Sequence, residues 1–251
     1  MDKGERFVIK SGENDMVGYI TKPEGEGKFP TVIVSHGFSS NTNRTHPYAQ
    51  IFARAGYATV IFDFTKTGTG ESSGDSTLVS ALTEIEDLRV MLDYVKTLDF
   101  VDADNITLAG CSMGGFVTAL LAPEVESEVK KLVLFFPAFC IPDHTREGHV
   151  QTTHFDPENI PDIIETPRMR LGRKFAEDVI NMDAFECCKH FSKPVLIVHG
   201  IEDYVVTVDY SEKAAVLYKD CTLKEIHGDH GFNTEESFAE CKKLTLEWLT
   251  R

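Results

Sequence analysis

The sequence lacks features that would point to several classes of protein. No apolar run is long enough to span a bilayer, and no signal-type apolar stretch follows the charged residues 1–6. The six cysteines show no C-x-x-C spacing, and no cluster of His, Cys and carboxylates has zinc-site spacing. Basic residues are scarce, since 25 Lys and Arg stand against 40 Asp and Glu. These absences predict a cytoplasmic protein with free thiols, no metal or cofactor, and no membrane or nucleic-acid partner.

Alternating strand and helix patterns fill most of the 251 residues. Short apolar runs predict strands at 7–10, 16–21, 31–35, 58–62, 106–109, 132–136, 194–198 and 222–226. Helical spacing predicts helices at 47–55, 78–97, 116–121, 210–218 and 235–249. This rhythm is typical of an α/β fold, with a mostly parallel twisted sheet of about eight strands and helices on both faces. The first two strands are expected to form an antiparallel hairpin at the edge.

One segment breaks the rhythm. Residues 137–188 hold five prolines, many charges and no strong strand pattern, and they are too many for a loop in a compact domain. We therefore expect a core of residues 1–136 and 186–251, with residues 137–185 inserted as a lid or cap.

A serine turn lies between a predicted strand and a predicted helix. The letters GCSMG at 110–114 match G-x-S-x-G, the pattern of a nucleophile elbow, in which a strained turn projects the serine above the sheet. Ser112 is then the nucleophile, and the N–H of Met113 at the helix N-terminus can donate to an oxyanion. The alternative is a glycine-rich tight turn without chemistry.

Candidates for the acid and the base follow in the order that an α/β-hydrolase requires. After the strand at 194–198, Asp203 is favoured as the orienting acid over Glu202. After the last strand, His230 is favoured as the base over His227, because it lies further out in a loop that can swing over Ser112.

The loop after the strand at 31–35 is expected to supply a second oxyanion donor, the backbone N–H of Phe38. We expect His36 to be a structural histidine beneath this loop. The glycine-rich loop at 63–72 lacks the G-K-[ST] ending of a phosphate-binding loop, so it is predicted to be structural.

Taken together, these motifs make the chain similar to the bacterial feruloyl (cinnamoyl) esterases, which are serine esterases of the α/β-hydrolase superfamily. The resemblance covers almost the full length. It is carried by VSHGFSSN (34–41), FDFTKTGTGESSG (62–74), LAGCSMGG (108–115), HGIEDYVV (199–206), IHGDHGF (226–232) and, in the insertion, HFDPENIPD (154–162) and LGRKFAEDV (171–179). It implies Ser112, Asp203 and His230 as the triad, the N–H groups of Phe38 and Met113 as the oxyanion hole, and a lid that holds the acyl group.

The chain departs from that family's pattern at three places. Cys111 stands where those esterases usually carry His, Met113 where Gln is usual, and the loop at 63–68 is longer. In that family a polar lid residue holds the hydroxyl of the substrate ring. The candidates here are Asp143, His144 and His154, with no choice between them. The phenylalanines that could line an apolar slot are Phe135, Phe136, Phe139 and Phe155, although Phe135 is better explained as core.

The predicted function is hydrolysis of carboxylic esters through an acyl-enzyme, with release of hydroxycinnamic acids such as ferulate. The partner is then a small-molecule ester, and a homodimer is compatible with the sequence. Three alternatives stay open: a short-chain carboxylesterase or thioesterase without aromatic preference, a serine peptidase of the acyl-peptide type, and a non-catalytic binding protein with the same fold.

Overall fold

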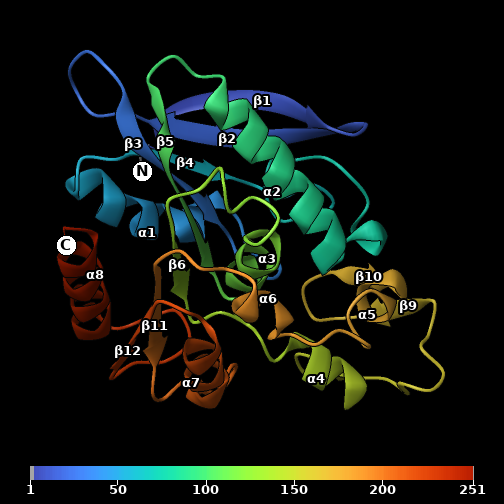
Figure 1. Ribbon diagram of the computed structural model, residues 1–251. Coiled ribbons are helices and arrows are strands. Elements are labelled where there is room, and N and C mark those ends of the chain that lie inside the picture. Colours follow the sequence, from blue (N-terminus) through green and yellow to red (C-terminus); the bar gives the residue numbers. More distant parts are fainter. Residues whose placement is uncertain (1–2, 251) are drawn as a thin grey trace.

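The computed structural model describes residues 3–250, which form an eight-stranded sheet with helices on both faces (Figure 1). The sheet order is β1-β2-β4-β3-β5-β6-β11-β12. The strands are β1 (Glu5–Ser11), β2 (Asn14–Thr21), β3 (Phe29–Ser35), β4 (Ala58–Phe62), β5 (Val101–Cys111), β6 (Lys131–Phe135), β11 (Val195–Gly200) and β12 (Cys221–Ile226). β1 pairs antiparallel with β2, and β2 with β4, whereas every other pair is parallel. The predicted α/β fold with an antiparallel edge hairpin is confirmed.

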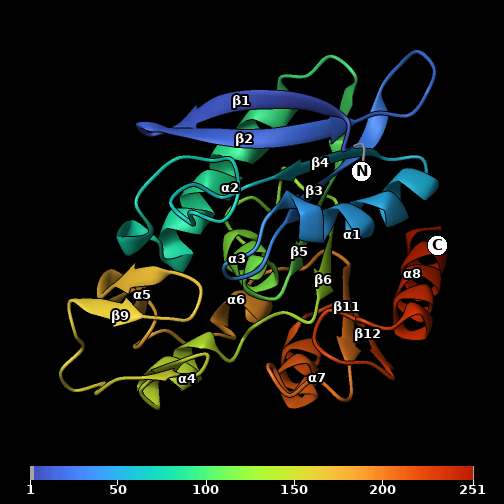
Figure 2. The same ribbon diagram turned by 180° about the vertical axis from the view of Figure 1, so that it is seen from behind.

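Two helical layers bury the two faces of this sheet. α2 (Ala81–Lys96), α3 (Met113–Leu121) and α7 (Val208–Leu217) pack on one face, and α1 (Thr42–Arg54) and α8 (Glu235–Leu249) pack on the other (Figures 1 and 2). The alternation of side chains along a strand produces this division. In β3, Ile33 joins the core under α2 and α3, while its neighbours Val32 and Val34 join the core under α1 and α8.

Helix α1 begins earlier than the sequence pattern predicted. The sequence pattern predicted a helix over residues 47–55, with Pro47 as its first residue. The helix in fact starts at Thr42, and Pro47 lies inside it. The side chain of Asn41 accepts the N–H of Asn43, and Asp63 accepts the N–H of Thr42 at 2.7 Å. These two caps stabilise an additional turn, and one of them comes from a distant loop that sequence spacing does not reveal.

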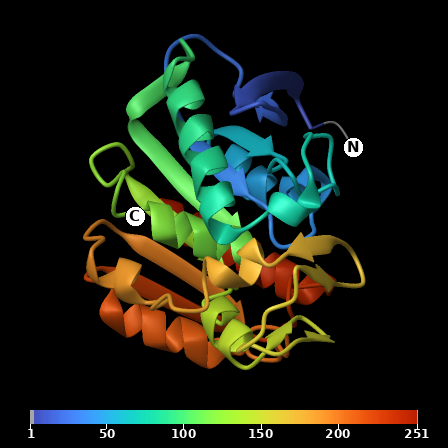
Figure 3. The same ribbon diagram turned by 90° about the vertical axis from the view of Figure 1, so that its right-hand side faces the viewer.

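The segment that was predicted to be an insertion folds into short elements. These are α4 (Ile141–Arg146), β7 (His149–Val150), β8 (Thr153–His154), β9 (Ile163–Glu165), β10 (Arg170–Gly172) and α5 (Lys174–Glu177), followed by α6 (Glu186–Lys189). The strands form two small antiparallel hairpins, each too short to leave a strand pattern in the sequence. Figure 3 shows the segment gathered on one side of the molecule. Val150, Ile164, Leu171 and Phe175 anchor it in the core cluster under α2 and α3.

The six cysteines all lie in the described part of the chain and are free thiols. Among residues 3–250, no helix has the length and apolar character needed to cross a bilayer.

Candidate active site

Ser112 occupies a strained turn between β5 and α3. Its φ of 53° and ψ of −122° lie outside the regions that non-glycine residues normally adopt. Backbone hydrogen bonds hold this conformation, because the Ser112 N–H donates to the Phe135 carbonyl at 3.0 Å and the Ser112 carbonyl accepts the N–H groups of Phe116 and Ala138. A Cβ atom at Gly114 would lie 2.3 Å from the His36 carbonyl oxygen, so only glycine lets the helix approach the loop this closely.

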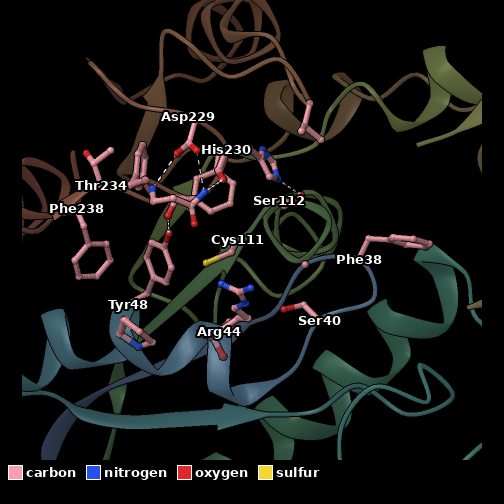
Figure 4. A pocket seen from close by; sticks show the side chains of 18 of the residues that line it. Phe38, Ser40, Arg44, Tyr48, Cys111, Ser112, Asp229, His230, Thr234 and Phe238 are labelled. Atoms are coloured by element: carbon pink, nitrogen blue, oxygen red, sulfur yellow. Dashed lines mark hydrogen bonds between the residues drawn. The ribbon is translucent and has the colours of Figure 1, made fainter. Parts of the chain in front are cut away.

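Three parallel strands bring the candidate catalytic residues together. Ser112 follows β5, Asp203 follows β11 and His230 follows β12, and the carboxyl ends of these strands share one edge of the sheet. His230 Nε2 lies 3.0 Å from Ser112 Oγ (Figure 4). His230 Nδ1 lies 2.7 Å from Asp203 Oδ2. The imidazole also packs edge-on against the ring of Phe136, with the ring centroids 4.7 Å apart. Serine, imidazole and carboxylate thus form one hydrogen-bonded chain.

The carboxylate of Asp203 is buried and almost fully satisfied. Its Oδ1 accepts the N–H groups of Val205 and Val206, each at 2.9 Å, and its Oδ2 lies 3.2 Å from His199 Nε2. Burial alone would raise the pKa of Asp203, but the hydrogen bonds from His199 and His230 outweigh it and hold this pKa well below its usual range. The ionised carboxylate therefore fixes the tautomer with a proton on His230 Nδ1, which leaves Nε2 free to accept the serine proton.

The competing acid and histidine form a separate pair at the surface. Glu202 lies 2.8 Å from His227 Nδ1 and also accepts the N–H of Gly228, and the side chain of His227 is exposed. Neither residue reaches Ser112. The loop geometry therefore favours the two residues that the sequence analysis preferred.

The loop after β3 lies directly against the serine. A Cβ atom at Gly37 would be 3.0 Å from Ser112 Cβ, which brings Phe38 next to the nucleophile. Within residues 3–250, no backbone hydrogen bond uses the N–H of Phe38 or of Met113. His36 is buried below the loop, where its Nε2 accepts the N–H of Phe64 at 3.0 Å and its Nδ1 lies 2.8 Å from the Gly37 carbonyl oxygen. Its role is structural, as the sequence predicted.

Two cavities meet at Ser112. One, of about 540 Å³, is bordered by residues 137–185, and its lining includes Met113, His144, His149 and Phe175. The other, of about 850 Å³, lies beside α1 and α8 and is shown in Figure 4. Both cavities are lined by Phe38, Ser112, Gln151, Arg168, Tyr204 and Val205.

The polar candidates of the insertion are separated by the fold. His144 lines the smaller cavity, and its ring lies 4.5 Å from that of His149. Burial, and to a lesser extent His149, lower the pKa of His144. Asp143 instead accepts a hydrogen bond from Tyr210 at 2.9 Å and pairs with Arg146. His154 is exposed on β8, on the far side of His149.

The aromatic lining differs from the expectation. Phe135 and Phe139 are fully buried in the core, as was expected for Phe135, and Phe155 packs against the core from a partly buried position. Phe136 lines the larger cavity. The smaller cavity takes its aromatic walls from Phe38 and Phe175, whose rings meet edge to face at 5.7 Å. Phe175, His149 and Arg44 also line the cavities but were not predicted from the sequence. The sequence signal for His149 is the regular spacing of three histidines at 144, 149 and 154.

The sheet order, the serine turn and the Ser–His–Asp chain define a serine hydrolase of the α/β-hydrolase class. Residues 28–155 match the family model described as serine aminopeptidase, S33, and the chain belongs to this α/β-hydrolase family.

Comparison with known proteins supports the esterase class. The structure of Est1E from Butyrivibrio proteoclasticus with ferulic acid bound superimposes with a TM-score of 0.89 at 27% identity, over 98% of this chain and 100% of that one. The putative esterase YitV of Bacillus subtilis (strain 168) is 26% identical over 195 residues, 75% of this chain and 74% of that protein. An uncharacterized 31.7 kDa Escherichia coli protein from the traX-finO intergenic region is 35% identical over 94 residues, but the match spans only 32% of its length. The chain is thus a member of the α/β-hydrolase family that is similar to a putative esterase over 75% of its length.

Proposed function

We propose that the chain hydrolyses carboxylic esters through an acyl-enzyme formed on Ser112. His230 Nε2 removes the hydroxyl proton while Ser112 Oγ attacks the ester carbonyl, and the same proton then passes to the departing alcohol. Water repeats the sequence, and the acid leaves as Ser112 regains its proton. Asp203 holds the imidazole and stabilises its cationic form. The observation that carries this proposal is the continuous chain of contacts from Ser112 Oγ to His230 Nε2 at 3.0 Å and from His230 Nδ1 to Asp203 Oδ2 at 2.7 Å.

The oxyanion of each tetrahedral intermediate would be bound by the N–H groups of Phe38 and Met113. Both residues adjoin Ser112, one in the loop after β3 and one at the start of α3, where the helix dipole also favours negative charge. Each such donor contributes roughly 10²- to 10³-fold in rate.

The acyl group would occupy the smaller cavity, with residues 137–185 as the lid over it. Met113, a candidate oxyanion donor, lines this cavity, and His230 does not, which is the arrangement expected on the acyl side of the scissile bond. A hydroxycinnamoyl group is the acyl group that we propose. Phe38 and Phe175 would contact its ring, and His144 is the one polar lid candidate of the three that lines the cavity. The ferulic acid bound to the similar Est1E supports this choice.

Hydrolysis of methyl ferulate and of p-nitrophenyl butyrate tests the proposal, with wild type and Ser112→Ala compared. We expect both substrates to be turned over and both activities to fall at least about 10⁴-fold in the variant. Turnover of butyrate alone would retain the serine mechanism and refute the hydroxycinnamoyl preference. Folded wild type that hydrolyses neither ester and does not react with a fluorophosphonate probe would favour the non-catalytic alternative.

A further inference from the structure

The position of His230 assigns the larger cavity to the leaving alcohol; this inference rests on the proposed function. The group that protonates the departing oxygen must lie within hydrogen-bond reach of it. His230 lines the 850 Å³ cavity and not the 540 Å³ one. An ester bound at Ser112 therefore directs its alcohol portion toward α1 and the start of α8, into a cavity that Gln151 and Arg168 border from residues 137–185.

One wall of this cavity carries the cation of Arg44, which has no ion-pair partner among the residues that the structure describes. Arg44 projects from α1 into the cavity near Cys111, and Ser40 lies beside it (Figure 4). Within residues 3–250, the Arg44 guanidinium forms no ion pair and no side-chain hydrogen bond. Arg44 is an exposed residue, so its guanidinium is accessible to a ligand from solvent. The arginines that pair with a carboxylate are Arg6, Arg89, Arg146, Arg170 and Arg173.

The acidic residues of the same cavity do not neutralise Arg44. Glu202 accepts hydrogen bonds from His227 and Gly228, and Asp229 accepts two from Asn233, one at 2.8 Å from the backbone N–H and one at 3.0 Å from the side chain. Glu235 lies in the first turn of α8, where the helix dipole stabilises its carboxylate. The positive charge of Arg44 is therefore available to a ligand. A second arginine, Arg168, reaches the same cavity from the turn between β9 and β10, and it too has no ion pair in the described part of the chain.

We propose that Arg44 is a specificity-determining residue that selects esters whose alcohol portion carries a carboxylate. A guanidinium binds a carboxylate through paired N–H donors, a geometry that a neutral amide of the same shape does not match. The overall negative charge of the protein repels anions at long range, but ions in solution screen that repulsion within about 8–10 Å. The nearby cation thus decides the preference once the ester is bound.

A matched pair of esters tests this preference: 4-butyryloxybenzoate and 4-butyryloxybenzamide. They form the same butyryl-enzyme and differ only in the charge of the leaving group, so the ratio of their kcat/KM values reports on that charge during acylation. We expect the ratio of acid to amide to fall about three- to tenfold in Arg44→Gln, and to fall less in Arg44→Lys, which keeps the positive charge but loses the paired donors. Higher salt should lower the ratio in wild type and have less effect in Arg44→Gln.

Arg54→Gln is the matched control. Arg54 lies on the same helix and likewise has no ion pair with any residue from 3 to 250, but it borders a different surface hollow. An unchanged ratio in Arg44→Gln, or an equal fall in Arg54→Gln, would overturn the inference while Ser112-dependent hydrolysis continues. If neither ester is hydrolysed in a Ser112-dependent way, the proposed function fails and this inference fails with it.

Discussion

The substitution Asp203→Asn isolates the role of the carboxylate with little change in shape. In the native site Oδ1 accepts the N–H groups of Val205 and Val206, while Oδ2 accepts the proton of His230 Nδ1. An asparagine keeps its carbonyl oxygen on the two backbone donors and so presents its NH₂ group to His230. That group can only donate, which forces the imidazole proton onto Nε2. The base is then blocked toward Ser112.

The expected loss follows from this change of tautomer. In the variant, His230 can accept the serine proton only in the tautomer with its proton on Nδ1, which no longer has a hydrogen-bond acceptor at residue 203. In addition, no carboxylate balances the positive charge that forms on His230. Loss of both effects in a serine triad costs on the order of 10⁴-fold in kcat, or about 5.4 kcal/mol at 1.36 kcal/mol for each factor of ten. The Ser112 hydroxyl itself is unchanged, so the variant should retain ester binding.

Steady-state hydrolysis of p-nitrophenyl butyrate measures the effect, and circular dichroism verifies the fold. Glu202→Gln is the matched control, because it removes one carboxylate from the adjacent position, where the partner is the exposed His227. We expect the control to retain activity within about threefold of wild type. A folded Asp203→Asn protein that loses less than tenfold, or a control that loses as much, would contradict the assigned roles.

Two further predictions concern stability. Gly114→Ala places a Cβ atom 2.3 Å from the His36 carbonyl oxygen and should lower the free energy of unfolding by about 3 kcal/mol or more. Gly56→Ala is the control, because Gly56 has a φ of 83° but open space around it, and this variant should lose about 1–2 kcal/mol. Urea denaturation measures both losses, and equal values would contradict the packing argument. Because the folded-state pKa of Asp203 is depressed, its carboxylate contributes stability above its unfolded pKa of about 3.9, and this contribution is lost as the pH falls further. The urea midpoints of wild type and Asp203→Asn, measured between about pH 2 and pH 6, should therefore approach each other as the pH falls. A difference between the two midpoints that stays constant over this range would refute the depressed pKa of Asp203.

Much of the fold was readable from local patterns. The strand prediction at 58–62 and the helix prediction at 235–249 match β4 and α8, because an apolar β-branched run and a capped amphipathic stretch are signals within one element. The serine turn was also readable, since the glycines of its motif meet a local steric need. Helix α1 was predicted to start five residues too late, because the cap from Asp63 is 21 residues away in the chain.

The sequence by itself determined the order of strands and helices, the turn at Ser112 and a short set of candidates for its partners. Only the tertiary structure decided that His230 rather than His227 reaches Ser112, and that Asp143 is held by Tyr210 while His144 faces a cavity. It also decided that Arg44, which has no ion pair among residues 3–250, projects into the larger cavity near Cys111. The physical reason is the separation along the sequence over which each kind of interaction acts. Backbone geometry and periodic burial act between residues a few positions apart, whereas a catalytic contact joins loops more than 100 residues apart, and its geometry depends on how the whole sheet twists and packs.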